Sequence, residues 1–283
     1  MAGTGFHSGE LEVQDRTGVR GGAARLSGML APADLNDGVV HFLAERRLAF
    51  LAARDLDGQL WVSALEGPEG FLEAGPDWLH VHSTLRPGDP LEQLPGGQAV
   101  GLITIDFPTR RRFRLNGTLA VVGGDGLEIT LDQGYGNCPK YIHPRSLGDA
   151  APAADDTPHE TTTALSPEQV ELIRAADTFF LGTTHPERGN DVSHKGGPTG
   201  FVEVRGNELW WPDFVGNQMF NSFGNLAVDD AAALFFADYA SGQTLHLSGR
   251  ATVEFDAATE TGRAARFVVE AVRWGVPLQQ RED

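Results

Sequence analysis

A run of basic residues occurs in an otherwise acidic chain. The formal net charge is −17 at pH 7, yet the segment between Phe107 and Val121 holds four arginines and no acid: Arg110, Arg111, Arg112 and Arg114. Guanidinium groups grip phosphate through paired hydrogen bonds. Strand alternation places Arg110, Arg112 and Arg114 on one face and Arg111 on the other. A subset that includes Arg112 is therefore predicted to contact an anion. The alternative is a solvated strand edge, which arginine protects well.

The segment VSHKGGPTGF, residues 192–201, supplies a second cationic point. Lys195 is followed by two glycines, so its ammonium group and nearby backbone amides can meet one anion. The predicted contacts here are Val192, Ser193, His194 and Lys195. Residues 62–71, VSALEGPEGF, repeat the pattern but have Ala64 and Leu65 where the later copy has the two basic residues. The charge is therefore specific to one copy.

A polar cluster lies in WWPDFVGNQMFNSFGN, residues 210–225. Its glycines allow tight turns or a close backbone approach. Its amides and hydroxyls precede an apolar strand, where an Asn or Ser can cap a short helix whose free N–H groups form an anion site. A capping turn without a ligand is equally compatible with the segment. The predicted contacts are Trp211, Asp213, Gly216, Asn217 and Asn221.

A third cluster, YGNCPKYIHPR, spans residues 135–145. It adds Asn137 and Lys140 as candidate contacts, together with the thiol of Cys138. The corresponding end of the second half, WGVPLQQRED, lacks the asparagine, cysteine and lysine. Each half thus carries features that the other lacks, which predicts that both halves contribute to one shared site.

The two halves are copies of one unit. At an offset of 130 residues, 50–73 aligns with 180–203, matching Phe50 with Phe180 and Ser63 with Ser193. At an offset of 132, 101–121 aligns with 233–253. Chance similarity between two β-rich segments is the alternative, and the nearly constant offset disfavours it.

Each unit is expected to open with a short helix, at 37–46 and 167–176. Ser166 is a suitable N-cap and Gln169 completes a capping box. Six short strands per unit predict a small antiparallel barrel. They are expected at 48–54, 60–65, 78–83, 99–107, 112–122 and 127–131 in the first unit, and at 178–184, 201–206, 208–213, 232–239, 244–255 and 266–274 in the second.

Composition and length set the domain plan. The 283 residues are divided into a disordered or extended lead-in (1–30), a first barrel unit (31–145), a linker rich in Ala, Pro, Asp and Thr (146–165) and a second unit (166–283). The negative charge argues against nucleic acid and anionic membranes as partners. No apolar run approaches 18 residues, so no membrane span is expected. A single cysteine excludes an internal disulfide, and a cytoplasmic location is the default expectation.

These motifs together carry a family resemblance. DVSHKGGPTGF, LWWPDFVGNQMFNSFGNLAVDDAAALFFAD and TLHLSGRA resemble pyridoxamine 5′-phosphate oxidase-related, FMN-binding split-barrel proteins. RRRFRLNG and QGYGNCPKYI resemble the long bacterial branch of that family. The resemblance covers roughly residues 35–145 and 165–255. It implies a mainly β protein with minor α content, whose two tandem split-barrel units form an intrachain pseudo-dimer with FMN at the interface.

The resemblance also implies roles for individual residues. Val192 to Lys195 would lie along the flavin, and Trp211 to Asp213 with Gly216 to Asn221 would border the ribityl phosphate. The oxidase proper has an Arg-Lys pair where this chain has Gln218 and Met219. Lys195 and the arginine run are the candidates to replace that charge. The oxidase's substrate-binding arginine motif near the C-terminus has no clear match.

The predicted function is an FMN-dependent oxidoreductase that accepts electrons from a reduced nicotinamide, NAD(P)H, or a similar donor and passes them to a small organic acceptor. The alternative is a non-catalytic binding module for flavin or haem. The chain is expected to act as a monomeric pseudo-dimer or a homodimer. His80 and His82 share a strand face and are compatible with a metal, but no metal site is assigned, because strand alternation explains the spacing equally well.

Overall fold

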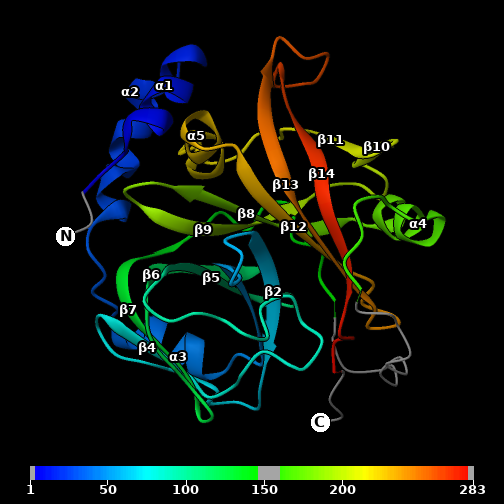
Figure 1. Cartoon of the computed structure of the whole chain (residues 1–283). Coiled ribbons are helices and arrows are strands. Elements are labelled where there is room, and N and C mark those ends of the chain that lie inside the picture. Colours follow the sequence, from blue (N-terminus) through cyan, green and yellow to red (C-terminus); the bar gives the residue numbers. More distant parts are fainter. Residues whose placement is uncertain (1–3, 146–159, 280–283) are drawn as a thin grey trace.

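The structure, a computed structural model, describes residues 4–145 and 160–279. The chain is mainly β, and its strands form two seven-stranded antiparallel sheets, one in each half (Figure 1). The first sheet contains β1 (Leu48–Arg54), β2 (Leu60–Glu66), β3 (Leu72–Ala74), β4 (Trp78–Val81), β5 (Ala99–Asp106), β6 (Arg111–Gly123) and β7 (Gly126–Gly136). The second contains β8 (Thr178–His185), β9 (Gly189–Gly196), β10 (Glu203–Arg205), β11 (Glu208–Pro212), β12 (Ala231–Ala237), β13 (Thr244–Phe255) and β14 (Arg263–Gly275).

The two sheets share one strand order. The first runs β2-β1-β5-β6-β7-β4-β3, and the second, read from its β9 end, runs β9-β8-β12-β13-β14-β11-β10. Every strand of the first sheet therefore has a counterpart seven places later in the chain. The expectation of six strands per unit is wrong by one in each half. It omits the three-residue β3, which is too short to show alternation, and β9, whose glycines and polar residues conceal it.

Strand registers confirm the internal duplication. Leu51 lies opposite Ser63 in the first sheet, and Leu181 lies opposite Ser193 in the second, which is the 130-residue offset. Leu102 pairs with Leu51, and Leu234 pairs with Leu181, which is the 132-residue offset. Both sheets also have a register shift just before a glycine, at Gly117 and Gly249.

The two units pack against each other through equivalent residues. Each has its own apolar core, and a third buried cluster joins them. That third cluster contains the counterpart pairs Phe50 and Phe180, Val62 and Val192, and Ile103 and Phe235. An interface in which the same surface of two copies meets itself is the arrangement of a two-fold dimer. The chain is therefore a pseudo-dimer of two tandem barrel units.

The short helices follow local capping signals. α3 (Asp37–Ala44) and α4 (Pro167–Ala175) lie where the sequence predicts helices, each ending one or two residues earlier. Ser166 caps α4, and its reciprocal hydrogen bonds with Gln169 complete the predicted capping box. Most of the predicted linker, 146–159, lies outside the described residues. None of the helices in the described ranges is long and apolar enough to cross a membrane.

The N-terminal segment is ordered as helix, so the prediction of a disordered or extended lead-in over residues 1–30 is wrong for its described part. It forms α1 (Ser8–Arg16), α2 (Arg20–Ala23) and the 3-10 helix η1 (Ala24–Leu30). Figure 1 shows α1 beside α5 (Asn221–Val228) of the second unit. The helices touch at glycines: a Cβ on Gly9 would lie 2.1 Å from the Gly224 carbonyl oxygen. Such long-range packing leaves no local signature in the sequence.

Candidate functional site

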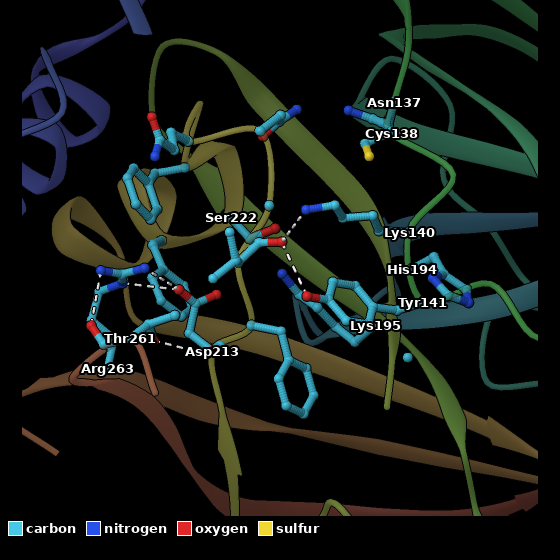
Figure 2. Close-up of a pocket in the computed structure, with 18 of the residues that line it drawn as sticks. Asn137, Cys138, Lys140, Tyr141, His194, Lys195, Asp213, Ser222, Thr261 and Arg263 are labelled. Carbon is cyan, nitrogen blue, oxygen red and sulfur yellow. Dashed lines mark hydrogen bonds and ion pairs between the residues drawn. The ribbon is translucent and has the colours of Figure 1, made fainter. Parts of the chain in front are cut away.

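A cavity of about 350 Å³ lies where the two units meet. Its walls come from β6 and residues 137–141 of the first unit, and from β9, residues 211–217 and α5 of the second. Figure 2 shows Lys140, Tyr141 and His194 on one side and Asp213 and Arg263 on the other. Lys140 and Lys195 are the only two lysines of the chain, and both line this cavity. Both lysines of this acidic protein are thus at one cavity.

His194, on β9, is buried and held by an arginine of the other unit. Arg112 Nη1 lies 2.9 Å from His194 Nδ1. Because a guanidinium can only donate, Nδ1 must accept, and the ring proton must be on Nε2. Burial and the nearby Arg112 hold the pKa of His194 well below its usual range, so the ring is neutral. Nε2 has no hydrogen-bond partner among the described residues.

Lys195 follows His194 and is half-buried, with its Nζ 5.6 Å from the centre of the Phe223 ring. Burial lowers the pKa of Lys195 to about 8, although the negative charge of Asp213 opposes the shift. A lysine with its pKa near 8 remains largely protonated at neutral pH. It therefore presents a poorly solvated positive charge that an anionic ligand would stabilise.

Two of the four clustered arginines line the cavity. Arg112 and Arg114 are on β6, two residues apart. Burial, reinforced by the charge of Arg114, lowers the pKa of Arg112 to about 9. Arg114 is itself paired with Asp191, at 2.8 Å. Arg112 is therefore the less compensated of the two cations.

Arg110 and Arg111 are outside the cavity. Arg110 lies before the strand, in a turn, with φ of 57°. The prediction that it shares a strand face with Arg112 and Arg114 is therefore wrong, because strand alternation begins only at Arg111. Arg111 is exposed over the Phe42 ring.

Residues 137–141 close one side of the cavity mouth. Tyr141 donates a hydrogen bond to the Val215 carbonyl oxygen at 3.1 Å, and its ring stacks on Phe214 with centroids 5.2 Å apart. Lys140 reaches the same carbonyl oxygen at 3.5 Å. Asn137 and Cys138 line the wall behind them. The first unit thus contacts the loop that contains Phe214 and Val215 of the second unit, across the opening of the cavity (Figure 2).

The second unit supplies an ion pair and the N-terminal end of a helix. Asp213 forms an ion pair with Arg263 at 2.8 Å, and Trp211 is buried beside them. α5 begins after Phe220, which has φ of 62°. Among the described residues no side chain caps this helix. Its first N–H groups are therefore available, and Ser222 and Phe223 from this turn line the cavity.

The predicted site residues fall into two groups. The structure brings most of them together at the cavity: Arg112, Asn137, Lys140, His194, Lys195, Trp211, Asp213, Gly216, Asn217 and Asn221. Val192 and Ser193 are not among the lining residues. Val192 is in the apolar cluster between the units, and Ser193 bonds Ser222 at 2.9 Å.

Other lining residues are not in the predicted set. Tyr141, Phe214 and Arg263 line the cavity, as does Arg114. Tyr141 and Phe214 directly follow the predicted residues Lys140 and Asp213 in the sequence, and this adjacency is the only sequence feature that points to them. Arg263 reaches the cavity from the β13–β14 hairpin, which no sequence pattern links to it. Gln218 is exposed at the rim and Met219 is fully buried. Because both side chains are neutral, neither brings charge to the site.

A buried polar network supports α5 from behind. Glu10 of α1 accepts hydrogen bonds from Asn221 Nδ2 at 2.6 Å and from the His7 backbone at 2.8 Å. His7 Nε2 lies 3.0 Å from Asn225 Oδ1. Burial raises the pKa of Glu10 to about 7. The N-terminal segment therefore fixes the helix whose first turn lines the cavity.

The pseudo-two-fold relates this cavity to a second one, which is lined by residues of the first unit and by Gln279 of the second. That counterpart cavity has a volume of about 360 Å³. Ala64 lines it where the first cavity has His194, and Glu66 lines it where the first has Gly196. Glu66 pairs with Arg86 at 3.2 Å and accepts from the Gln279 backbone at 3.0 Å. The counterpart cavity therefore has an acid where the first has glycine.

The counterpart cavity also lacks the helix. The described residues 82–98, which correspond to the loop and α5 of the second unit, contain no helix. Thr244 and His246 lie at the counterpart positions of Arg112 and Arg114. The two copies have diverged so that both lysines, Arg112 and the start of α5 occur at the first cavity, whereas the basic residues of the counterpart cavity are His82 and Arg86.

No protein-family model matches the chain, and no curated protein matches its sequence. Similar solved structures include a protein of the pyridoxine-phosphate oxidase family from Clostridium acetobutylicum, related to general stress protein 26 of Bacillus subtilis. It is 16% identical, has a TM-score of 0.30 and covers 38% of this chain and 84% of its own. The FAD-binding protein from Mycobacterium smegmatis is 13% identical, has a TM-score of 0.28 and covers 41% of this chain and 97% of its own.

The haem storage protein HutZ from Vibrio cholerae is also similar, at 13% identity and a TM-score of 0.29, with coverage of 41% of this chain and 98% of its own. The family that the sequence resembles is thus represented among the structural neighbours, at low sequence identity.

Proposed function

We propose that the cavity between the units binds FMN and that the protein is an FMN-dependent oxidoreductase. One observation carries the proposal: Arg112, Lys195 and the uncapped start of α5 converge on a cavity with aromatic walls. A phosphate monoester with a flat aromatic ring has the matching chemistry, because cations and helix N–H groups bind phosphate and aromatic side chains pack against rings. A volume of about 350 Å³ is in the range of small-ligand pockets, about 300–1,000 Å³.

Buried polar atoms without a hydrogen-bond partner test whether the cavity residues suit a polar ligand. Among the described residues, buried polar atoms without a hydrogen-bond partner include Arg112 Nε, Arg114 Nε, Asn137 Oδ1 and His194 Nε2. All four belong to residues that line the cavity. Leaving such atoms unpaired costs about 1–3 kcal/mol each. A polar ligand that pairs with them would recover part of this cost, so the residues present fit a ligand with both donors and acceptors.

The phosphate charge would be met without the Arg-Lys pair of the oxidase. Lys195, Arg112 and the first turn of α5 are the groups in place for this role. Arg263 is partly neutralised by Asp213, so it would contribute less. Lys140, exposed at the mouth, would attract the anion rather than hold it.

The neutral His194 would serve the ring end of the ligand. Since its proton is on Nε2, it can donate one hydrogen bond to a carbonyl or ring nitrogen. Tyr141 and Phe214, stacked at the mouth, would limit water access. When bound, FMN would supply hydride or electron transfer, and a reduced nicotinamide or similar donor is the proposed partner. Both units would contribute to a single FMN site per chain.

A haem-binding module is the second candidate, because His194 and Cys138 both line the cavity and either residue type can hold haem iron. The Arg112 contact disfavours His194 as that ligand. It places the ring proton on Nε2, which removes the lone pair that iron needs there. Cys138 would then be the available axial group.

The test is to purify the chain from a flavin-replete host, record its visible spectrum and identify any released chromophore by mass. FMN and riboflavin would then be titrated separately by calorimetry. We expect one FMN per chain, with riboflavin weaker because it lacks the phosphate. Failure to bind either flavin would refute the proposal, bound haem would favour the second candidate, and two FMN per chain would show that the counterpart cavity also binds.

A further inference from the structure

The outer face of the β3–β4 hairpin brings two histidines and a glutamate together. Glu73 lies directly opposite His80 in the β3–β4 ladder, and His82 is two residues further along the same face. The imidazole rings of His80 and His82 stack with centroids 4.1 Å apart. His82 Nε2 lies 2.8 Å from Glu73 Oε2. One ligand atom from each of the three residues lies within 4.8 Å of the others.

A second carboxylate flanks this cluster. Glu128 of β7 is opposite His80 on its other side, so Glu73, His80 and Glu128 form a row across three adjacent strands. Glu128 is exposed. The row presents two carboxylates to solvent around the imidazoles, which favours a cation there electrostatically.

We propose that Glu73, His80 and His82 bind a zinc ion. Zn²⁺ takes histidine nitrogen and carboxylate oxygen at about 2.0–2.2 Å in a tetrahedral arrangement. Donor atoms already within 4.8 Å of each other need only small side-chain rotations to reach one ion. Mg²⁺ and Ca²⁺ prefer all-oxygen sites, so they fit this donor set poorly. Three protein ligands leave the fourth position to water or to Glu128.

At this location a bound ion would hold the edge of the first sheet in place. β3 is the edge strand of the first sheet and is only three residues long. A Zn²⁺ held by Glu73 of β3 and two histidines from the end of β4 would tie this edge to its neighbour. None of the three ligands lines the cavity between the units, although His82 lines the counterpart cavity. The zinc proposal therefore does not rest on FMN binding at the cavity between the units.

The test uses the full-length chain without a histidine tag, in a Cys138→Ser background so that the single thiol does not bind zinc. After removal of metal with a chelator, Zn²⁺ is titrated in competition with a chromogenic chelator. We expect one Zn²⁺ per chain, and at least tenfold weaker binding in His80→Ala, His82→Ala and Glu73→Gln, since even supporting groups of a zinc site contribute 10–100-fold. Excess Mg²⁺ should not displace it.

His41 is the matched control. It is an exposed histidine 3.3 Å from Glu45, a single ion pair without a second imidazole, so His41→Ala should leave zinc affinity unchanged. Far-UV circular dichroism checks that each variant is folded. Zn²⁺ should also raise the Tm of the parent protein and not that of His80→Ala. Equal affinity in the parent and both histidine variants, or no stoichiometric binding by the parent, would overturn the proposal.

Discussion

Phe50 and Phe180, which occupy equivalent positions in the two units, stack on each other with ring centroids 3.5 Å apart and an interplanar angle of 19°. Both are almost fully buried. Contact between a residue and its own counterpart marks a pseudo-two-fold axis. Because the cavity lies between the same two units, this apolar contact helps to set the distance between Arg112 on one side and His194 on the other.

Phe180→Ala should destabilise the chain by about 3–5 kcal/mol, the usual cost of emptying a buried phenylalanine position. Phe50→Ala should cost a similar amount, because it removes the other half of the same stack. The measurement is the free energy of unfolding in urea for the parent, both single variants and the double variant.

The double variant distinguishes the contribution of the contact between the two rings from the contribution of each ring's packing against other residues. Because the two rings contact each other, the sum of the losses in unfolding free energy in the two single variants should exceed the loss in the double variant. The expected difference is about 0.5–3 kcal/mol. Strict additivity would mean that the rings contribute independently and that the stack does not couple the units.

Lys195→Met should weaken FMN binding about 10–100-fold, because a hydrogen bond to a charged group contributes about 1.5–3 kcal/mol. Riboflavin affinity should change much less, since riboflavin has no phosphate. Calorimetric titration of both flavins measures the difference. Arg25→Met, at an exposed arginine outside the cavity, is the control and should affect neither. An equal loss for both flavins would place Lys195 at the ring and not at the phosphate.

FMN affinity should fall as the pH rises above about 8. In the free protein burial lowers the pKa of Lys195 to about 8, so above this pH the lysine must take up a proton to meet the phosphate. The fall should approach tenfold per pH unit for one proton. Titrations from pH 7 to 9.5 test this, and in Lys195→Met the decline should be absent.

The duplicated fold could be predicted from sequence because turn glycines and apolar positions recur at fixed offsets. The pairing of Leu51 with Ser63 and of Leu181 with Ser193 follows those offsets directly. The helical N-terminal segment could not be predicted, because Gly9 and Val13 are buried against the second unit. Such contacts depend on the assembled fold.

The candidate site was predictable to the extent that residue type reveals function. A lysine beside glycines and an arginine run without acids predict contacts with an anion, and both segments line the cavity between the units. Orientation was harder to predict. Val192 and Ser193 belong to the same strand as the lining residues His194 and Lys195, but Val192 packs between the units and Ser193 bonds Ser222 of α5. Arg263 approaches through a hairpin more than 40 residues away from Asp213 in sequence, so only the fold reveals it.

Glu10→Gln should make the chain more stable at high pH. Burial raises the pKa of Glu10 from its usual value near 4.5 to about 7, so the folded state prefers the protonated acid. The contribution of the Glu10 carboxyl to folding stability is therefore fully present below pH 4.5, and it is lost as the pH rises through 7. A shift of this size corresponds to about 3 kcal/mol. Glutamine mimics the protonated acid at every pH, and Asn221 can turn its amide to accept from it.

Unfolding free energies at pH 5 and pH 8.5, with hydrogen exchange of the α1 amides, measure this effect. The variant and the parent should be similar at pH 5, and the variant should be more stable at pH 8.5, with slower exchange in α1. Glu12→Gln, at an exposed position of the same helix, should show no such gain. If Glu10→Gln has the same pH dependence as the parent, the Glu10 carboxyl is not the group that titrates. Because Glu10 bonds Asn221 at the start of α5, a real gain should also strengthen FMN binding at high pH.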